Sequence, residues 1–143
     1  MTLPLLYFDT SAIVPAFVRE PATERVQALI ASRDGEGLAV SPWVLTEFSS
    51  ALALKRRIGE IDANVFAAAL GEWRIFIESV DILPVEEAAF REAALICQRH
   101  ESGLRAGDAL HLAVAAANGC TLATLDERMA KAAAELGVAV TEV

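Results

Sequence analysis

Five short, mostly apolar segments, separated by longer segments with a helical pattern, constrain the fold of this chain most. The five segments are residues 5–8, 38–40, 80–83, 121–123 and 138–141. Strands of three to five residues separated by helices are typical of a parallel sheet that is covered on both faces. The segments between them predict about seven helices, at residues 12–18, 21–32, 43–57, 62–78, 85–101, 106–118 and 127–136. We therefore predict an α/β fold, a single α/β/α sandwich with a mostly parallel five-stranded sheet.

Length and composition narrow the class of protein. At 143 residues the chain predicts one domain, spanning residues 1–143. With 55% hydrophobic and 22% charged residues it is too apolar for intrinsic disorder, and no apolar run approaches the ~18 residues of a membrane span. Cys97 and Cys120 lie inside apolar segments and are expected to be free thiols. Because a secretory signal is also lacking, we expect a cytoplasmic protein without membrane contact.

The net charge limits how the chain can bind nucleic acid. Twelve Lys and Arg residues against 20 Asp and Glu residues leave a formal charge of −8. Proteins that grip nucleic acid over a wide surface are generally basic, so this mode is disfavoured. Contact with a polyanion would have to be local, bridged by a metal ion, or assisted by a partner.

Four acidic residues are expected at one edge of the sheet. Asp9 ends the first predicted strand and Asp126 follows the fourth, whereas Glu47 and Asp108 lie near the starts of two helices. Ligands of open α/β sheets gather at the carboxyl ends of the strands. The helix dipole accounts for an acid in a first helical turn, and a helix-capping role is an equally good explanation for Asp9 alone. A buried Asp9 nevertheless needs a cation, hydrogen bonds or a proton.

Taken together, the four carboxylates favour a metal site. Their mutual repulsion would make an empty site unfavourable, and a divalent cation would relieve it. A set of oxygen ligands without nearby His or Cys suits Mg²⁺ or Mn²⁺ better than Zn²⁺. Such a site is typical of metal-assisted hydrolysis of a phosphodiester.

Four motifs lie along the chain, YFDTSA at residues 7–12, LTEF at 45–48, LRAGDALHLA at 104–113 and LATLD at 122–126. They resemble the motifs of the PIN-domain family, and in particular of its VapC-type toxins from toxin–antitoxin pairs. The motifs match in order and spacing, and the resemblance covers almost the whole chain.

The resemblance implies a Mg²⁺- or Mn²⁺-dependent endoribonuclease that cleaves RNA, forms a homodimer and is neutralised by a cognate antitoxin protein. It implies an acidic quartet made of Asp9, Glu47, Asp108 and Asp126. Asp9 and Asp108 would bind the metal directly or through water, and Glu47 and Asp126 would complete the site and help orient the attacking water. Thr10, Ser11 and Thr124 would hydrogen-bond the carboxylates or metal-bound waters.

Several other polar residues have plain structural explanations. Arg105 lies three residues before Asp108, so a contact with the scissile phosphate and an ion pair with Asp108 are both open. The basic run at residues 55–57 is expected to be a solvated helix end, with RNA contact as the alternative. His111 shares a helix face with Asp108, and we expect a largely buried, hydrogen-bonded residue rather than a general base.

Two other kinds of function stay open at this point. A haloacid-dehalogenase-like phosphatase or a receiver domain also places an Asp after the first strand, but Ser11 replaces the second Asp of the phosphatase motif and the only lysines are Lys55 and Lys131. A non-catalytic module could instead bind a basic protein segment with these acids. Such a module would keep its function when Asp9 and Asp108 become Asn. The aromatic residues of the helices at 43–57 and 62–78 are expected in the core or on a dimer or partner surface. The two helices are expected to form a hairpin that packs on another chain.

Overall fold

The computed structural model describes residues 3–143 and contains a five-stranded sheet at its centre. The strands are β1 (Leu6–Phe8), β2 (Leu38–Val40), β3 (Asp81–Ile82), β4 (Thr121–Ala123) and β5 (Val140–Thr141). They lie in the order β3-β2-β1-β4-β5, and all four pairings are parallel. The prediction of a mostly parallel five-stranded sheet is confirmed.

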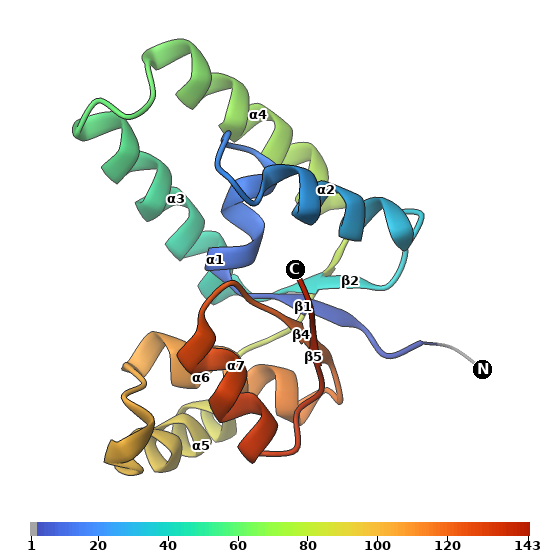
Figure 1. Ribbon diagram of the computed structural model, residues 1–143, viewed down its shortest axis with the longest axis vertical. Coiled ribbons are helices and arrows are strands. Elements are labelled where there is room, and N and C mark those ends of the chain that lie inside the picture. The colour runs from blue at the N-terminus through green and yellow to red at the C-terminus, as the bar shows by residue number, and fades with distance from the viewer. Residues whose placement is uncertain (1–2) are drawn as a thin grey trace.

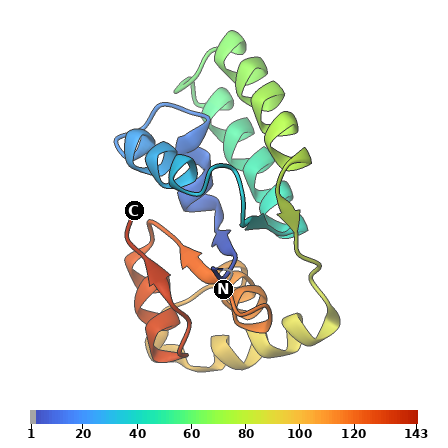
Figure 2. The same cartoon turned by 90° about the vertical axis from the view of Figure 1, so that its right-hand side faces the viewer.

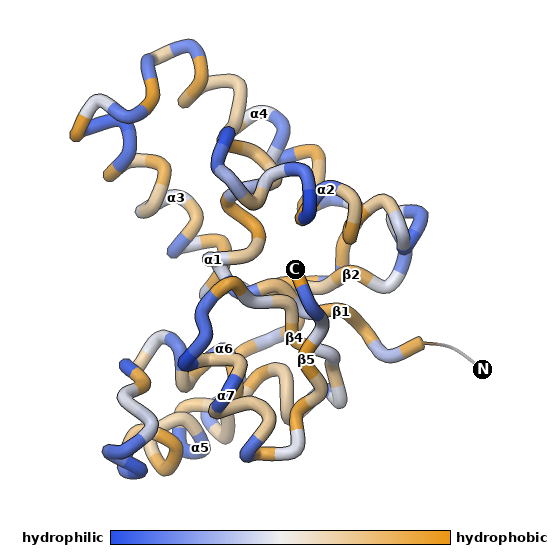
Figure 3. The backbone as a smooth tube through the Cα atoms, viewed as in Figure 1, coloured by the Kyte–Doolittle hydropathy of each residue, from blue (hydrophilic) through white to orange (hydrophobic). Residues whose placement is uncertain are grey.

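Seven α-helices in the described residues cover the two faces of this sheet, which confirms the predicted sandwich. They are α1 (Thr10–Ile13), α2 (Thr23–Ser32), α3 (Pro42–Arg57), α4 (Ala63–Glu78), α5 (Glu87–Gln98), α6 (Ala106–Ala117) and α7 (Glu127–Glu135). Helices α1 to α4 lie on one side of the sheet and α5 to α7 on the other (Figures 1 and 2). The central strands are mostly apolar, and hydrophilic segments lie around the periphery (Figure 3).

Two predicted helices are shorter than expected. The helix predicted at residues 12–18 is a four-residue α1 followed by a 3₁₀ turn, Val14–Ala16. Pro15 has no N–H and cannot donate the hydrogen bond that would continue an α-helix. The helix predicted at 85–101 begins at Glu87 and ends at Gln98, because Arg99 leaves helical geometry before a 3₁₀ turn at His100–Ser102.

The aromatic side chains of the α3–α4 hairpin belong mainly to the core. Phe48 of α3 stacks on Trp73 of α4 with 4.0 Å between ring centroids, and Phe17 packs edge-on against both. Phe48 is fully buried and Trp73 is nearly so. This cluster fixes α3, the helix that carries Glu47, against the rest of its layer.

The order of the strands creates a distinctive edge at their carboxyl ends. The chain moves outward from β1 through β2 to β3, and then returns to add β4 on the other side of β1. This reversal between β1 and β4 is the position where open α/β sheets bind ligands. Asp9 follows β1 directly, and its backbone N–H donates to Ala123 at the end of β4. None of the helices among residues 3–143 combines the length and apolar character needed to cross a membrane.

Candidate active site

Asp9 is buried at the junction of β1 and β4 and is held by three hydrogen bonds. Its Oδ1 accepts from the Ser11 hydroxyl at 2.7 Å and from the Ala12 backbone N–H at 3.0 Å. Its Oδ2 accepts from the Thr124 hydroxyl at 2.5 Å. Burial raises the pKa of Asp9, and the bonds from Thr124 and Ser11 oppose that rise. Asp9 is therefore both the N-cap of α1 and an oriented carboxylate at the sheet edge.

Glu47 reaches the same edge of the sheet from α3, the helix that follows β2. Its Oε1 accepts from the Thr10 hydroxyl at 2.7 Å and lies 2.5 Å from Nε2 of His111. Burial raises its pKa, but the hydrogen bonds from His111 and Thr10 outweigh this effect and leave the pKa lowered. Glu47 is thus ionised and held through one oxygen, and the prediction that His111 is a buried, hydrogen-bonded residue is confirmed.

Asp108 and Asp126 bring two further carboxylates to this region. Asp108 lies in the first turn of α6 and Asp126 is the N-cap of α7, where its Oδ1 accepts from the backbone N–H groups of Arg128 and Met129. The capping role of Asp126 was not predicted, although an Asp just before a helix is its usual signal. Burial raises the pKa of Asp108, and the negative charges of Asp126 and Glu47 raise it further. The negative charges of Asp126 and Glu47 therefore act on Asp108 at this edge of the sheet.

Arginine and lysine do not balance this acidic site. Among the described residues, the ion pairs of Lys and Arg involve none of the four acids, and Glu47 pairs only with His111. The exposed Arg105 makes no ion pair with Asp108 there, so that alternative is wrong. Lys55 is not a solvated helix end, because its Nζ lies 2.6 Å from Glu20 and 3.1 Å from Glu60.

The donor chemistry of the site fits a hydrated divalent cation. Within residues 3–143 no three Asp, Glu, His or Cys side chains form a group that would hold a metal ion by themselves. Mg²⁺ commonly uses one or two carboxylates and fills its remaining positions with water or substrate oxygens. A Cβ added to Gly107 would lie 3.4 Å from Glu47 Oε2 and 3.3 Å from Trp43 Nε1. The absence of a side chain at Gly107 therefore keeps Glu47 Oε2 uncrowded.

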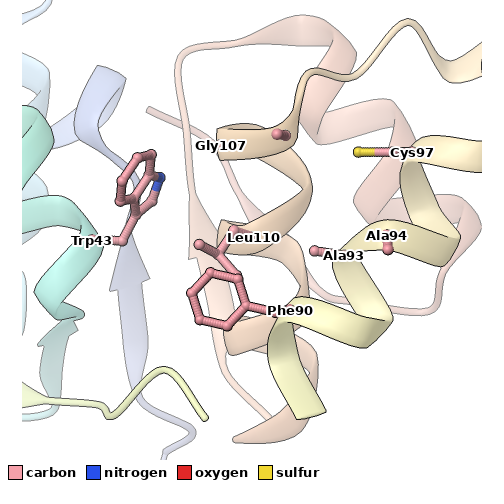
Figure 4. Close-up of a pocket in the computed structure, with 8 residues that line it drawn as sticks. Trp43, Phe90, Ala93, Ala94, Cys97, Gly107 and Leu110 are labelled. Atoms are coloured by element: carbon pink, nitrogen blue, oxygen red, sulfur yellow. The ribbon is translucent and has the colours of Figure 1, made fainter. Parts of the chain in front are cut away.

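An apolar cleft of about 280 Å³ adjoins Glu47 between α3, α5 and α6. Figure 4 shows Trp43 on one side of the cleft and Phe90, Leu110 and Gly107 on the other. Trp43 Nε1 is the one buried side-chain polar atom among the described residues that has no hydrogen-bond partner. Trp43 and Gly107 both line the cleft, and a Cβ added to Gly107 would approach both Trp43 Nε1 and Glu47 Oε2.

Solved structures with the same fold include components of toxin–antitoxin systems. FitAcB from Neisseria gonorrhoeae is 24% identical, with 96% of this chain and 97% of that chain covered and a TM-score of 0.73. VapC20 from Mycobacterium tuberculosis, a toxin that cleaves the sarcin–ricin loop, is 23% identical, with 89% and 94% covered and a TM-score of 0.70. DNA-bound VapBC from Salmonella typhimurium is 14% identical, with 97% and 98% covered and a TM-score of 0.72.

The sequence also matches a protein family over most of its length. A search of curated proteins found no match. The model of the PIN domain matches residues 6–135, which include all four motifs from the segment that contains Asp9 to the segment that contains Asp126. The extent of this match shows that the chain belongs to the PIN-domain family.

Proposed function

We propose that this chain is a divalent-metal-dependent endoribonuclease and the toxin of a toxin–antitoxin pair, with residues 1–143 acting as one domain. The observation that carries the proposal is that Asp9 lies buried at the switch point of the sheet, while the negative charges of Asp126 and Glu47 act on Asp108 and no Lys or Arg of the described residues forms an ion pair with any of these acids. Uncompensated acids at such an edge favour a site for a cation.

The roles proposed for the side chains follow from their contacts. Asp9 and Asp108 would hold the metal directly or through water, and Ser11 and Thr124 orient Asp9. A bound Mg²⁺ or Mn²⁺ would stabilise charge on the phosphodiester and promote ionisation of the attacking water.

The remaining acids would act on water rather than on the phosphate. Glu47 offers Oε2 to orient the attacking water, because Oε1 is occupied by Thr10 and His111. Asp126 would complete the site with Oδ2, since its Oδ1 caps α7. Arg105 is exposed beside Asp108 and would contact the phosphate.

RNA is the proposed substrate because of the neighbouring structures. VapC20 cleaves the sarcin–ricin loop, and its fold matches 89% of this chain. The acidic charge of −8 argues against wide contact with RNA. We therefore propose a narrow recognition element near the scissile bond and a local, metal-bridged contact.

An antitoxin is the proposed protein partner. Several solved structures of the same fold are toxin–antitoxin complexes. We propose that a basic antitoxin segment lies in or beside the acidic site, where Arg or Lys would take the place of the cation. Two copies of this chain would form a homodimer, which sedimentation analysis of the purified chain tests. The antitoxin proposal fails if a co-purified partner changes neither metal binding nor RNA cleavage.

The test of the function is cleavage of a mixed RNA pool by the partner-free chain. We expect cleavage with Mg²⁺ or Mn²⁺, none with EDTA, and at least a hundredfold loss in the Asp9→Asn, Asp108→Asn variant. The matched control is Glu72→Gln, which neutralises one exposed acid on α4 away from the site and should cleave like the wild type. Cleavage that survives EDTA or the double substitution would overturn the proposal and favour contamination or another site.

The remaining alternative is a non-catalytic module that binds a basic segment. It predicts that no divalent metal supports cleavage and that a basic partner binds the wild type equally well in EDTA and in Mg²⁺. The PIN-domain match favours the nuclease over a haloacid-dehalogenase-like phosphatase, and inertness of the chain toward small phosphate monoesters tests that preference.

A further inference from the structure

A buried chain of hydrogen bonds connects the core of the protein to Glu47. Ser41 Oγ lies 2.9 Å from the Tyr7 hydroxyl, and that hydroxyl lies 2.8 Å from His111 Nδ1. His111 Nε2 then meets Glu47 Oε1 at 2.5 Å. Tyr7 and Ser41 are fully buried and His111 is 2% exposed. These hydrogen bonds join β1, the start of α3 and the middle of α6 at the edge where the acids lie.

Ser41 contributes to this chain instead of performing its ordinary local role. It is the N-cap residue of α3, where a serine hydroxyl commonly accepts a hydrogen bond from the first turn of the helix. Here Ser41 makes no capping bond with its side chain, because its hydroxyl faces Tyr7. The Ser41 hydroxyl therefore leaves the first turn of α3 uncapped and contacts Tyr7 instead. Buried polar side chains joined in this way hold one arrangement when every member has a partner.

The hydrogen-bonding chemistry of Glu47 and His111 determines where the protons lie along this series of hydrogen bonds. A carboxylate only accepts hydrogen bonds, so His111 Nε2 must carry the proton that faces ionised Glu47. With a neutral ring, Nδ1 accepts from the Tyr7 hydroxyl and Ser41 donates to Tyr7. With a charged ring, the Tyr7 and Ser41 bonds reverse, and Nε2–H still donates to Glu47. The bond to Glu47 therefore has the same direction in both states of the ring.

This arrangement leaves the two oxygens of Glu47 with different tasks. Oε1 receives hydrogen bonds from both Thr10 and His111. None of the side-chain hydrogen bonds of the described residues reaches Oε2, which lies beside the space left by Gly107. One oxygen is thus anchored and the other is presented to the site.

We infer that Tyr7 and His111 are positioning residues, which hold the Glu47 carboxylate in one orientation so that Oε2 faces the reacting groups. Neither residue touches the substrate, and both act through Glu47. The inference rests on the proposed nuclease function for its effect on rate. The held orientation itself is a property of the metal-free protein and is tested separately.

The first test observes the His111 ring directly. The chain contains only two histidines, and the side chain of His100 is 95% exposed. Imidazole ¹⁵N NMR of the metal-free wild type and of His100→Gln should show one ring with a slowly exchanging proton on Nε2. In Glu47→Gln this signal should shift or exchange faster. A His111 ring protonated only at Nδ1, or one insensitive to Glu47→Gln, would overturn the inference whether or not the chain is a nuclease.

The second test measures the effect on cleavage. Tyr7→Phe removes only the hydroxyl, and His111→Leu removes both ring contacts. We expect a decrease in kcat of about fivefold for Tyr7→Phe and more than tenfold for His111→Leu, with KM little changed. His111→Gln can replace the N–H at Nε2 and should recover most of the loss. His100→Gln is the matched control and should cleave like the wild type.

A cycle of double variants separates positioning from general damage to the fold. If Tyr7 acts through Glu47, Tyr7→Phe should cause no further loss of rate in a Glu47→Gln background. A purely structural role would lower the rate by the same factor in both backgrounds, which would overturn the inference. A wild type that cleaves no RNA, together with the expected Nε2–H signal, would contradict the proposed function but support the held orientation of Glu47.

Discussion

The Thr124 hydroxyl donates a 2.5 Å hydrogen bond to Asp9 Oδ2 across the junction of β4 and β1, between residues that are 115 positions apart in the sequence. The same hydroxyl oxygen accepts from the Asp126 backbone N–H at 3.1 Å. Thr124 therefore links the Asp9 carboxylate to the backbone of Asp126 and ties the loop after β4 to the end of β1.

Removal of this hydroxyl should destabilise the fold. Thr124→Val keeps the shape of the side chain but leaves the buried Asp9 carboxylate without one donor, and we expect the free energy of unfolding to fall by about 1–3 kcal/mol. Urea denaturation measures the change. Thr46→Val is the matched control, because the Thr46 hydroxyl makes only a 3.5 Å contact with the Pro42 carbonyl and is exposed. An equal loss in both variants would contradict the special role of Thr124.

Stability should depend on pH through Asp108. Burial and then the charge of Asp126 raise the pKa of Asp108 above that of an ordinary aspartate, so the folded chain binds this proton more tightly than the unfolded chain. The stabilising contribution of Asp108 is fully present at pH values below the pKa of Asp108 in the unfolded chain. It is lost as the pH rises through the raised pKa of Asp108 in the folded chain. Asp108→Asn should therefore stabilise the metal-free chain at neutral pH, and the gain should shrink toward about pH 4.

Urea denaturation in EDTA at several pH values measures this trend. Asp81→Asn is a suitable control, since Asp81 is exposed on the edge strand β3. A gain for Asp108→Asn that stays constant with pH would show that repulsion and burial at Asp108 do not govern the effect.

Divalent metal should stabilise the wild type by binding the folded state. At a metal concentration one hundred times Kd, the expected gain is about 2.7 kcal/mol. The rise in Tm should disappear in the Asp9→Asn, Asp108→Asn variant and persist in Glu72→Gln, which lies outside the site. Differential scanning calorimetry with Mg²⁺, Mn²⁺ and EDTA measures it, and equal rises in all three proteins would argue against a metal site at these acids.

A methyl group at Gly107 should affect activity more than stability. The Cβ of Gly107→Ala would lie 3.4 Å from Glu47 Oε2 and 3.3 Å from Trp43 Nε1, which crowds both side chains. Alanine is favoured over glycine in a helix by about 1 kcal/mol, and this gain should roughly offset the crowding. We expect a clear loss of RNA cleavage with little change in the free energy of unfolding.

Gly71→Ala provides the comparison for Gly107→Ala. Gly71 lies within α4, and an added Cβ there would meet no atom within 4 Å. This variant should gain stability through helix propensity alone and cleave RNA like the wild type. If both glycine variants behaved alike, the close approach of Gly107 to Glu47 would have no functional consequence.

Much of the fold is readable in the sequence because it depends on local patterns. Short, mostly apolar segments mark the strands, and each of the five predicted segments contains an observed strand. The central strands β1 and β2 are buried along their whole length, whereas the edge strand β3 is exposed. The helix boundaries were less predictable, as the 3₁₀ turn at Val14–Ala16 shows. Helix ends depend on a few capping bonds and on contacts with other elements, which periodicity does not record.

In the candidate site, too, the local properties of the residues were predictable from the sequence. The positions of Asp9 after a strand and of Asp108 in a first helical turn are local properties, and the structure places both as expected. The sequence also determined that His111 shares a helix face with Asp108.

Only the tertiary structure decided which side chains those residues meet. His111 forms hydrogen bonds with Tyr7, 104 residues away, and with Glu47, 64 residues away. The Ser41 hydroxyl contacts Tyr7 and does not cap α3. These partners lie on different elements, and they come into contact only when α3 and α6 pack against opposite faces of β1. Helical and strand periodicity fix the face on which a side chain lies, whereas its partner across two layers is set by how whole elements pack together.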